Sequence, residues 1–464
     1  MTVARGRQHL LVGRSGGVLR LLGLWTPPAQ RDRRSCDAFV LLRCCLSFIL
    51  MASMPVASFS KLYWDTPDDL EELSSCIFVI MASIALLIKA GCFVAQQRSV
   101  HRLLRMVAAV RAAHSEQAAA GGGGGGCGGG GGGGRNDTRA AYRTRADAVF
   151  LYMQGMTAVA LCGWVCAPVV SGDASPSSSS DELNATLPHA KTPLPTWLPA
   201  GAQRSPGYEL LYLFEALCLT VSSQVLLCVD VFFIDLILLV VAELQVLNDN
   251  VAAVFVGATG SERREETPTG DSALPAVRRR RRTFSETFAV LDVTVDNTTQ
   301  RISEDMYDQL VGNIRHHQMI IQCVQVLQMA MSYSIFALLF FNMTSICLNI
   351  FVTASLLQSD VDLVTALKAV FTTPVFLYES AMYCIFGQMI IDQSEHLPLS
   401  AFSCGWTDAD TRLQKAVLVF MLRSSQPLRI QVGKTYELSK ETFVRVLNGS
   451  YALFNMLYTF QGKK

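Results

Sequence analysis

Lys89, Asp230 and Asp235 are ionisable residues that lie inside long apolar stretches of this sequence. A charged side chain in the hydrocarbon interior of a membrane is costly, so it faces the inside of a helix bundle and pairs with an opposite charge. We therefore predict that Lys89 pairs with one of the two aspartates. The alternative is that the long Lys89 side chain extends its ammonium group to the membrane surface.

Aromatic and sulfur-containing side chains are dense in one half of several apolar stretches. Ligand pockets are mostly apolar and carry few polar groups, so a small volatile molecule would suit such a lining. Ordinary helix packing, or a belt of aromatic residues at the membrane interface, would give the same pattern. The candidate pocket residues are Phe78, Met81, Met156, Trp164, Tyr212, Phe214, Phe371 and Phe376.

Enzyme and metal motifs are missing from the sequence. It has no HExxH, GxSxG or phosphate-loop pattern,. The polyglycine run at 121–134 matches GxGxxG only trivially, because no strand precedes it and no helical pattern follows it,. The adjacent His316 and His317 have the wrong spacing to share one helical face. We therefore expect no enzymatic activity, no cofactor and no metal site.

The composition is that of a membrane protein. Half of the 464 residues are hydrophobic and only 17% are charged, whereas soluble domains carry about 25% charged residues. The charges gather in a few loops between long apolar runs, as the cost of burying charge in lipid demands. The fourteen cysteines show no regular spacing, which indicates small apolar packing residues. A net charge of +1 points to no nucleic-acid partner.

Seven segments are long and apolar enough to be considered as membrane-spanning helices. A helix needs about 20 apolar residues to cross the hydrocarbon layer. The fourth and fifth segments exceed this length, so we expect them to continue into the cytoplasm as water-exposed helix. The last segment is short and mixed in composition. The predicted spans cover residues 38–59, 76–95, 148–170, 211–241, 328–357, 367–391 and 443–460.

The distribution of Lys and Arg predicts the orientation of these spans. Residues 1–37, 96–147 and 243–320 are rich in arginine, whereas the intervening loops 60–74 and 171–207 have few basic residues. Basic loops remain in the cytoplasm, so we expect a cytoplasmic N-terminus and an extracellular C-terminus. No cleavable signal peptide is expected, because the first residues lack a continuous apolar run.

Three loop features follow from this topology. Asn184 begins a glycosylation sequon in an outer loop,. The polyglycine run is expected to make a cytoplasmic loop at about 112–140 disordered. The five arginines from Arg278 to Arg282 favour contact with anionic lipid headgroups,. A kinase site at Ser285 and a nuclear signal are the alternatives for that run.

The C-terminal third carries an ordered set of short motifs. Tyr383-Cys384 with Gly387 is followed by Gln393-Ser394-Glu395 and then by Cys404 and Trp406. An Arg-x-x-Gln-Pro stretch and the segment 438–454 come next. This order resembles the odour-tuning subunits of insect odorant receptors. Residues 18–27 and 206–212 give weaker matches to the same family. The polyglycine and arginine insertions are not family features.

The resemblance implies an all-α membrane protein with seven transmembrane helices and a cytoplasmic helical anchor. It implies an odour-gated, non-selective cation channel at the plasma membrane of olfactory neurons, in which a tuning subunit forms a heterotetramer with a shared co-receptor. The expected regions are the N-terminal segment 1–37, spans one to four in 38–242, the basic loop 243–320, spans five and six with the anchor in 321–436, and the pore helix in 437–464.

The resemblance also assigns roles to residues. An apolar ring at Met456 or Leu457 would block ions by dewetting, while polar neighbours would contact passing cations. Ser439 is a suitable N-cap for the last helix. The expected pore and gate residues are Asn455, Met456, Leu457, Thr459 and Gln461. The expected anchor residues are Tyr383, Cys384, Gly387, Gln393, Ser394, Glu395, Cys404, Trp406, Arg423, Gln426 and Pro427.

Two other functions fit seven spans. A gustatory-type ligand-gated channel is the main alternative, although the chain lacks the Thr-Tyr-(x)5-Gln-Phe ending of that family. A metabotropic receptor that signals through G proteins would have an extracellular N-terminus, which the basic loops disfavour. No motif in the sequence identifies the ligand.

Overall fold

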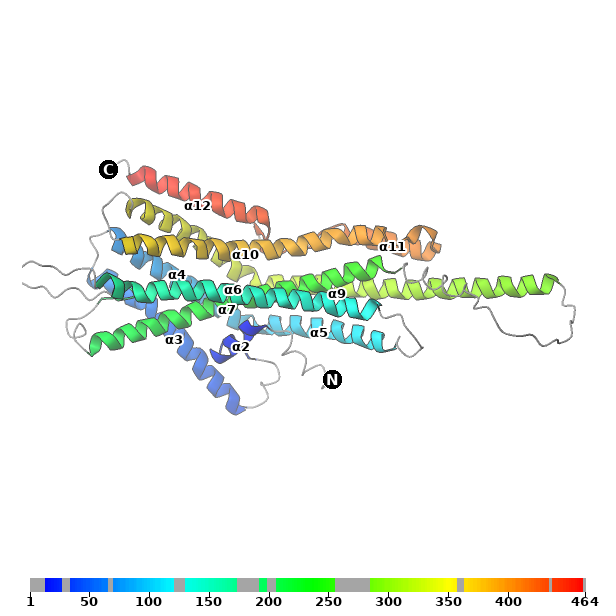
Figure 1. The fold of residues 1–464 in the computed structure, drawn as a ribbon, viewed down its shortest axis with the longest axis horizontal. Helices are drawn as coiled ribbons and strands as arrows, with labels where there is room; N and C mark the ends of the chain where they lie inside the picture. The colour runs from blue at the N-terminus through cyan, green and yellow to red at the C-terminus, as the bar shows by residue number, and fades with distance from the viewer. Residues whose placement is uncertain are drawn as a thin grey trace, which may run out of the picture.

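The computed structural model is an elongated bundle of long α-helices (Figure 1). It describes residues 13–26, 34–65, 70–120, 130–172, 192–197, 206–254, 284–356, 363–433 and 436–461. The predicted all-α class is confirmed, since the sole sheet in these ranges is a two-stranded hairpin of β1 (Gln431–Val432) and β2 (Tyr436–Glu437). Asn184 and Arg278 to Arg282 lie outside the described residues.

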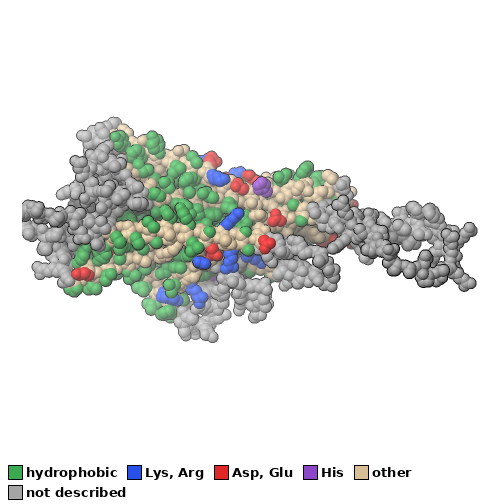
Figure 2. Space-filling model, viewed as in Figure 1, with side chains coloured by type: hydrophobic (Ala, Val, Ile, Leu, Met, Phe, Trp, Pro, Cys, Tyr) green, Lys and Arg blue, Asp and Glu red, His purple; other side chains and the backbone are tan. Residues whose placement is uncertain are grey.

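Six helices of the described chain are long and apolar enough to cross a membrane. They match the first six predicted spans, and α12 covers the seventh with a less apolar composition. On the face in Figure 2, hydrophobic side chains cover the left part of the bundle and charged ones gather farther right. The helices are α3 (Arg34–Trp64), α4 (Leu70–Ala95), α6 (Gly130–Gly172), α7 (Gly207–Ala252), α9 (Phe284–Leu356), α10 (Leu363–Phe402) and α12 (Lys440–Gln461).

Helix α7 forms the centre of the bundle. It packs against α3, α4, α6, α9 and α10, and its side chains are almost all buried from Val225 to Val251. A helix that is apolar on every side is buried, either inside a protein or in lipid, and here the neighbouring helices bury it. The expectation that its extension is water-exposed is therefore wrong, because Leu244 and Leu247 in that extension are fully buried.

The segments around the polyglycine run are more helical than expected. Helix α5 (Gln97–Ala120) and the start of α6 occupy much of the range 112–140, and only residues 121–129 of that range lie outside the description. Helix α5 packs against the long α9 and buries Val100, Leu103 and Val107. This buried apolar stripe explains why the chain is helical again in α5, after the predicted span 76–95.

A short N-terminal helix, α2 (Arg14–Leu21), packs against α7. The chain turns sharply just after this helix. Gly23 makes the turn with φ of 78°, and a Cβ atom there would lie 2.6 Å from the backbone nitrogen of Cys44. The turn buries Leu24 and Trp25. The Trp25 ring lies 5.0 Å from that of Phe232, centroid to centroid. Gly23 therefore allows the N-terminal segment to join the core.

The pore-helix candidate α12 lies along α9. Gly449 of α12 is so close to Met343 that a Cβ atom would meet its sulfur at 2.8 Å, and Ser450 Oγ donates to the Met343 carbonyl at 3.2 Å. At the start of α12, Ser439 Oγ accepts from the backbone nitrogen of Thr442 at 3.4 Å. This bond confirms the predicted N-cap.

The anchor region follows α10 and consists of the 3-10 turn η3 (Trp406–Asp408), helix α11 (Thr411–Ser424) and the β1–β2 hairpin. Trp406 packs beside Leu413, Val417 and Leu310 of α9. Ser394 Oγ accepts from the backbone nitrogen of Leu428 at 2.9 Å. These contacts hold the anchor against the long ends of α9 and α10.

We expect Gly23→Ala to reduce folding sharply. A non-glycine residue in the left-handed region costs roughly 1–2 kcal/mol, and the added methyl group would collide with the α3 backbone. The measurement is the thermal unfolding midpoint of the detergent-solubilised protein, with the amount at the cell surface.

The matched control for this substitution is Gly163→Ala in α6, where a Cβ atom meets no described atom within 4 Å. It should leave both quantities unchanged or slightly raised. Equal behaviour of the two variants would show that the Gly23 turn is not required.

Candidate functional site

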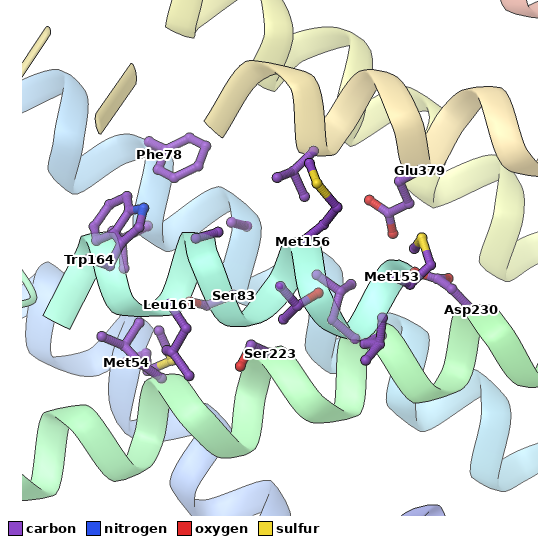
Figure 3. Close-up of a pocket in the computed structure, with 18 of the residues that line it drawn as sticks. Met54, Phe78, Ser83, Met153, Met156, Leu161, Trp164, Ser223, Asp230 and Glu379 are labelled. Atoms are coloured by element: carbon purple, nitrogen blue, oxygen red, sulfur yellow. The ribbon is translucent and has the colours of Figure 1, made fainter. Parts of the chain in front are cut away.

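A cavity of about 220 Å³ lies between α3, α4, α6, α7 and α10 (Figure 3). Its walls are mostly apolar, and its polar side chains include two carboxylates, which come from α7 and α10. The lining residues are Met54, Phe78, Val79, Ala82, Ser83, Met153, Met156, Thr157, Ala160, Leu161, Trp164, Leu194, Leu219, Ser223, Leu226, Leu227, Asp230, Val375, Tyr378 and Glu379. This composition is typical of a pocket for a small organic molecule.

One end of the cavity, which we call the aromatic end, is formed by stacked rings. The Phe78 and Trp164 rings lie 6.3 Å apart with an interplanar angle of 21°. Phe376 meets Phe78 edge to face at 5.7 Å. Aromatic pairs with these geometries are favourable beyond the area they bury, so the ring contacts stabilise the aromatic end.

A short strap, residues 192–197, closes the aromatic end. Leu194 of the strap is buried and lines the cavity. The buried carboxylate of Glu215 accepts from the Leu194 backbone nitrogen at 3.1 Å and from Thr196 Oγ1 at 2.7 Å. Trp197 stacks on Trp64 of α3 at 5.9 Å. Glu215, in the third turn of α7, therefore holds the strap over the pocket.

The opposite end, the acidic end, carries a buried charge cluster. Lys89 Nζ contacts Asp230 directly and donates to Glu379 Oε1 at 2.8 Å. Tyr383 OH donates to Asp230 Oδ1 at 2.6 Å, and Asn342 Nδ2 donates to Glu379 Oε2 at 3.2 Å. All five side chains are buried. The cluster joins α4, α7, α9 and α10 at one point.

The predicted pairing of Lys89 with an aspartate is confirmed, and the partner is Asp230. Extension of Lys89 to the surface is wrong, because only 3% of the residue is exposed. Asp235 instead accepts from Ser15 Oγ of α2 at 2.9 Å. Glu379 was missed, although an acidic residue in the middle of a predicted span was the signal that could have found it.

The predicted pocket residues separate into three groups. Phe78, Met156 and Trp164 line the cavity, and Phe376 supports it through Phe78. Tyr212, Phe214 and Met81 do not line it: Tyr212 OH donates to the Val165 carbonyl, Phe214 is 45% exposed, and Met81 is half-buried elsewhere. The side chain of Phe371 lies outside the described residues.

The predicted pore residues lie on the last turns of α12. Asn455, Met456 and Thr459 are exposed in the single chain, and Thr459 Oγ1 donates to the Asn455 carbonyl at 2.7 Å. The side chains of Leu457 and Gln461 lie outside the described residues. The exposed residues therefore form an accessible face on α12, which packs mainly on α9 and α10.

The anchor residues have different surroundings. Gln393 accepts from Asn248 of α7, and Gly387 lies against the carbonyl of Leu438. Cys384 and Cys404 are buried, while Glu395, Arg423 and Gln426 are exposed and Pro427 is half-buried. Tyr383 belongs to the charge cluster, because its hydroxyl bonds to Asp230.

A second buried charge cluster lies near the far end of α7. Glu243 accepts from Arg111 Nε of α5 and Arg139 Nη2 of α6, each at 2.7 Å. His316 Nε2 of α9 lies 3.6 Å from the same carboxylate. Within the described residues, no group of His, Cys, Asp or Glu has the arrangement of a metal site.

Comparison with known proteins gives a consistent family. The family model described as 7tm Odorant receptor matches residues 134–451. Odorant receptor 10 of Aedes albopictus is 25% identical over 151 residues, and odorant receptor 19a of Drosophila melanogaster is 24% identical over 148 residues. Each match covers 32% of this chain. The matched part is 39% of the Aedes albopictus receptor and 38% of the Drosophila melanogaster receptor, well under two thirds of either.

The fold also resembles a solved structure, that of the insect olfactory receptor OR5 from Machilis hrabei in complex with eugenol. The TM-score is 0.66, and the match covers 96% of this chain and 97% of the other at 13% identity. At this low identity the likeness concerns the fold.

We expect Lys89→Met to destabilise the bundle strongly. Removing one partner of a buried ion pair leaves its counter-charges unpaired, at a cost of roughly 3–5 kcal/mol. The combined variant Lys89→Met, Asp230→Asn, Glu379→Gln removes the charges together and should recover much of the loss. The measurement is the thermal unfolding midpoint of the purified protein.

The control for the Lys89 prediction is Arg445→Met, which breaks the exposed pair with Glu441 on α12. Such surface pairs contribute less than about 1 kcal/mol, so the midpoint should hardly move. If Lys89→Met is no more harmful than this control, the cluster does not stabilise the fold.

Proposed function

The chain belongs to the 7tm Odorant receptor family, whose model covers more than two thirds of it, and from this premise we propose that it is the odour-tuning subunit of an odour-gated, non-selective cation channel. The observation that carries the proposal is the mostly apolar cavity between α3, α4, α6, α7 and α10. In this proposal the cavity holds the odorant and α12 lines the pore.

The cavity fits a small volatile molecule. An apolar protein cavity of about 150 Å³ is large enough to bind benzene, and this one measures about 220 Å³. The structurally similar receptor of Machilis hrabei is described in complex with eugenol, a small aromatic compound. Stacked rings at one end and Met153 and Met156 along one wall offer an adaptable apolar lining,.

The pore assignment rests on the exposed face of α12. In a tetramer, the turn that contains Asn455, Met456 and Thr459 would face the central axis. Met456 would then narrow the closed pore and exclude water, while the polar neighbours would contact passing cations. The basic loops favour a cytoplasmic N-terminus, and a heterotetramer with a co-receptor at the plasma membrane completes the proposal.

A chain of direct contacts leads from the cavity to α12. Glu379 lines the cavity and accepts from Asn342 of α9. The next residue, Met343, contacts Gly449 and Ser450 of α12. An odorant opens the channel only if it binds the open arrangement more tightly than the closed one. A displacement of Glu379 on binding would reach α12 through one turn of α9.

Subunit assembly is proposed to use the anchor. Leu399 and Phe402 at the end of α10, and Leu418, Val419 and Leu422 on α11, are exposed in the single chain. Clusters of exposed apolar side chains mark surfaces that another protein covers. We assign this surface to contacts between subunits of the tetramer.

We expect Ala160→Phe to raise the odour concentration for half-maximal current at least about tenfold, because the larger ring fills the cavity. The control is Val159→Phe, the neighbouring residue, which is 65% exposed on the outer face of α6. The measurement is odour-evoked cation current in cells that express the chain with and without the co-receptor.

Current should require both subunits, and Val159→Phe should respond like the wild type. A full response from Ala160→Phe would remove the cavity from the proposal. A robust response without the co-receptor, or one carried by G proteins, would contradict the tuning-subunit function.

Substitution of the proposed gate should change conduction without changing odour recognition. Met456→Ser replaces an apolar side chain by a hydroxyl, so the constriction should be wetted and current in the absence of odour should rise several-fold. The odour dose that gives half of the evoked current should shift little. Unaltered leak and ion selectivity in a variant that reaches the surface would exclude Met456 from the gate.

A further inference from the structure

The charge cluster at the acidic end has an unequal number of positive and negative groups. Lys89 supplies one positive charge, and Asp230 and Glu379 supply two carboxylates. The two carboxyl groups also hydrogen-bond to each other, which requires a shared proton, and their remaining described partners, Tyr383 and Asn342, are neutral groups. With all three groups ionised, the cluster therefore has a formal charge of −1.

The excess charge faces the cavity. Asp230 and Glu379 both line it, whereas Lys89 is absent from the lining and lies behind them. In Figure 3 the Glu379 side chain points toward the space beside Met156, and Asp230 lies near Met153. The cavity is thus acidic at one end and aromatic at the other.

A buried negative charge requires a balancing positive charge. Desolvation of an unpaired carboxylate costs several kcal/mol in a protein interior. Either a proton or a cationic ligand can provide the balance. Glu379 Oε2 accepts from Asn342 at 3.2 Å, the Glu379 and Asp230 carboxyl groups share a hydrogen bond, and a carboxylate oxygen can accept two bonds once that shared proton has left. The site therefore has both the charge and the acceptor capacity for an N–H donor.

We propose that the ligand of this cavity is a small apolar amine, whose ammonium group binds Asp230 and Glu379 and whose apolar body extends toward Trp164. This inference rests on the proposed odorant-binding function and names the chemical class of the odorant. Charge-assisted hydrogen bonds are about twice as strong as neutral ones. The amine is thus preferred over a molecule of the same shape without a charge.

The binding step balances in atoms and charge. The neutral amine enters through apolar surroundings and takes up the proton that balances the empty site. An N–H bond forms as a carboxyl O–H bond breaks, and the ammonium group then faces two carboxylates and Lys89. The total charge is zero before and after. An alcohol can donate a hydrogen bond but cannot hold the proton, and a carboxylate ligand would add to the excess charge.

The test uses matched series of odorants with the same carbon skeleton. One series is 2-phenylethylamine, 2-phenylethanol and propylbenzene, and the others are straight-chain amines with the corresponding alcohols and alkanes. Currents are recorded from the chain expressed with its co-receptor, and surface labelling reports assembly. We expect at least one amine to act at roughly one-tenth of the concentration its alcohol needs, or less.

Two isosteric variants separate charge from shape. Glu379→Gln and Asp230→Asn each remove one negative charge and keep the size of the side chain, so within each variant the amine and its alcohol should act at about the same concentration, whatever the size of the maximal current. Having two variants keeps the test valid if one fails to reach the surface. The control is Glu441→Gln, which removes an exposed carboxylate on α12 and should keep the preference.

The outcomes distinguish the two proposals. If alcohols or alkanes evoke current and no amine outperforms its alcohol, the amine inference is overturned while the channel function stands. The same holds if the preference persists in both isosteric variants. If surface-expressed complexes respond to no odorant in a broad panel, the proposed function fails, and the inference fails with it.

Discussion

The contact of Lys89 with Asp230 and Glu379 is the constraint on which the arrangement of the helices depends. These groups are buried where the flanking residues are apolar, so none of them can exchange its partner for water. The cluster draws on α4, α7, α9 and α10. Sliding α4, α7 or α10 by one turn, about 5.4 Å, would separate a buried charge from its partner, and sliding α9 would remove the Asn342 donor from Glu379. The cluster thus fixes the mutual register of the helices that enclose the cavity.

The same cluster connects three features that would otherwise be independent. Its carboxylates form the acidic end of the cavity, Asn342 brings α9 into the network, and Met343 touches α12 one residue later. A ligand that changes the charge balance at Glu379 would therefore act directly on α9, the helix that contacts α12. The substitutions at Glu379 and Met456 therefore test two ends of one short path.

Hydropathy predicted the helices well, and the cavity only in part. Long apolar runs reveal spans because the cost of burying charge acts locally on the sequence. The pairing of Lys89 with Asp230 was predictable from the same cost, but Glu379, 290 positions from Lys89, required knowledge of which helices meet. The predicted Phe78 and Trp164 line the cavity while Phe214 faces outward, because an evenly apolar helix has no periodic signal for its inner face. The strap at 192–197 has no regular pattern, and its partner Glu215 is visible only in three dimensions.

The carboxylates at the two ends of the cavity have different partners: Glu215 binds the strap, whereas Asp230 and Glu379 belong to the charge cluster. This difference allows one end to stabilise the receptor while the other responds to a ligand. Each oxygen of Glu215 accepts a hydrogen bond from the strap, so this carboxylate fastens the strap to α7. At the acidic end, one lysine instead faces two carboxyl groups, so the charge count is uneven. Helix α12 packs closely on α9 at Gly449 and Ser450, whereas Asn455, Met456 and Thr459 on its last turns are exposed in the single chain. A segment with few buried contacts shifts at the lowest free-energy cost, so occupancy at the acidic end would move the last turns of α12 before it disturbs the stacked rings of the aromatic end.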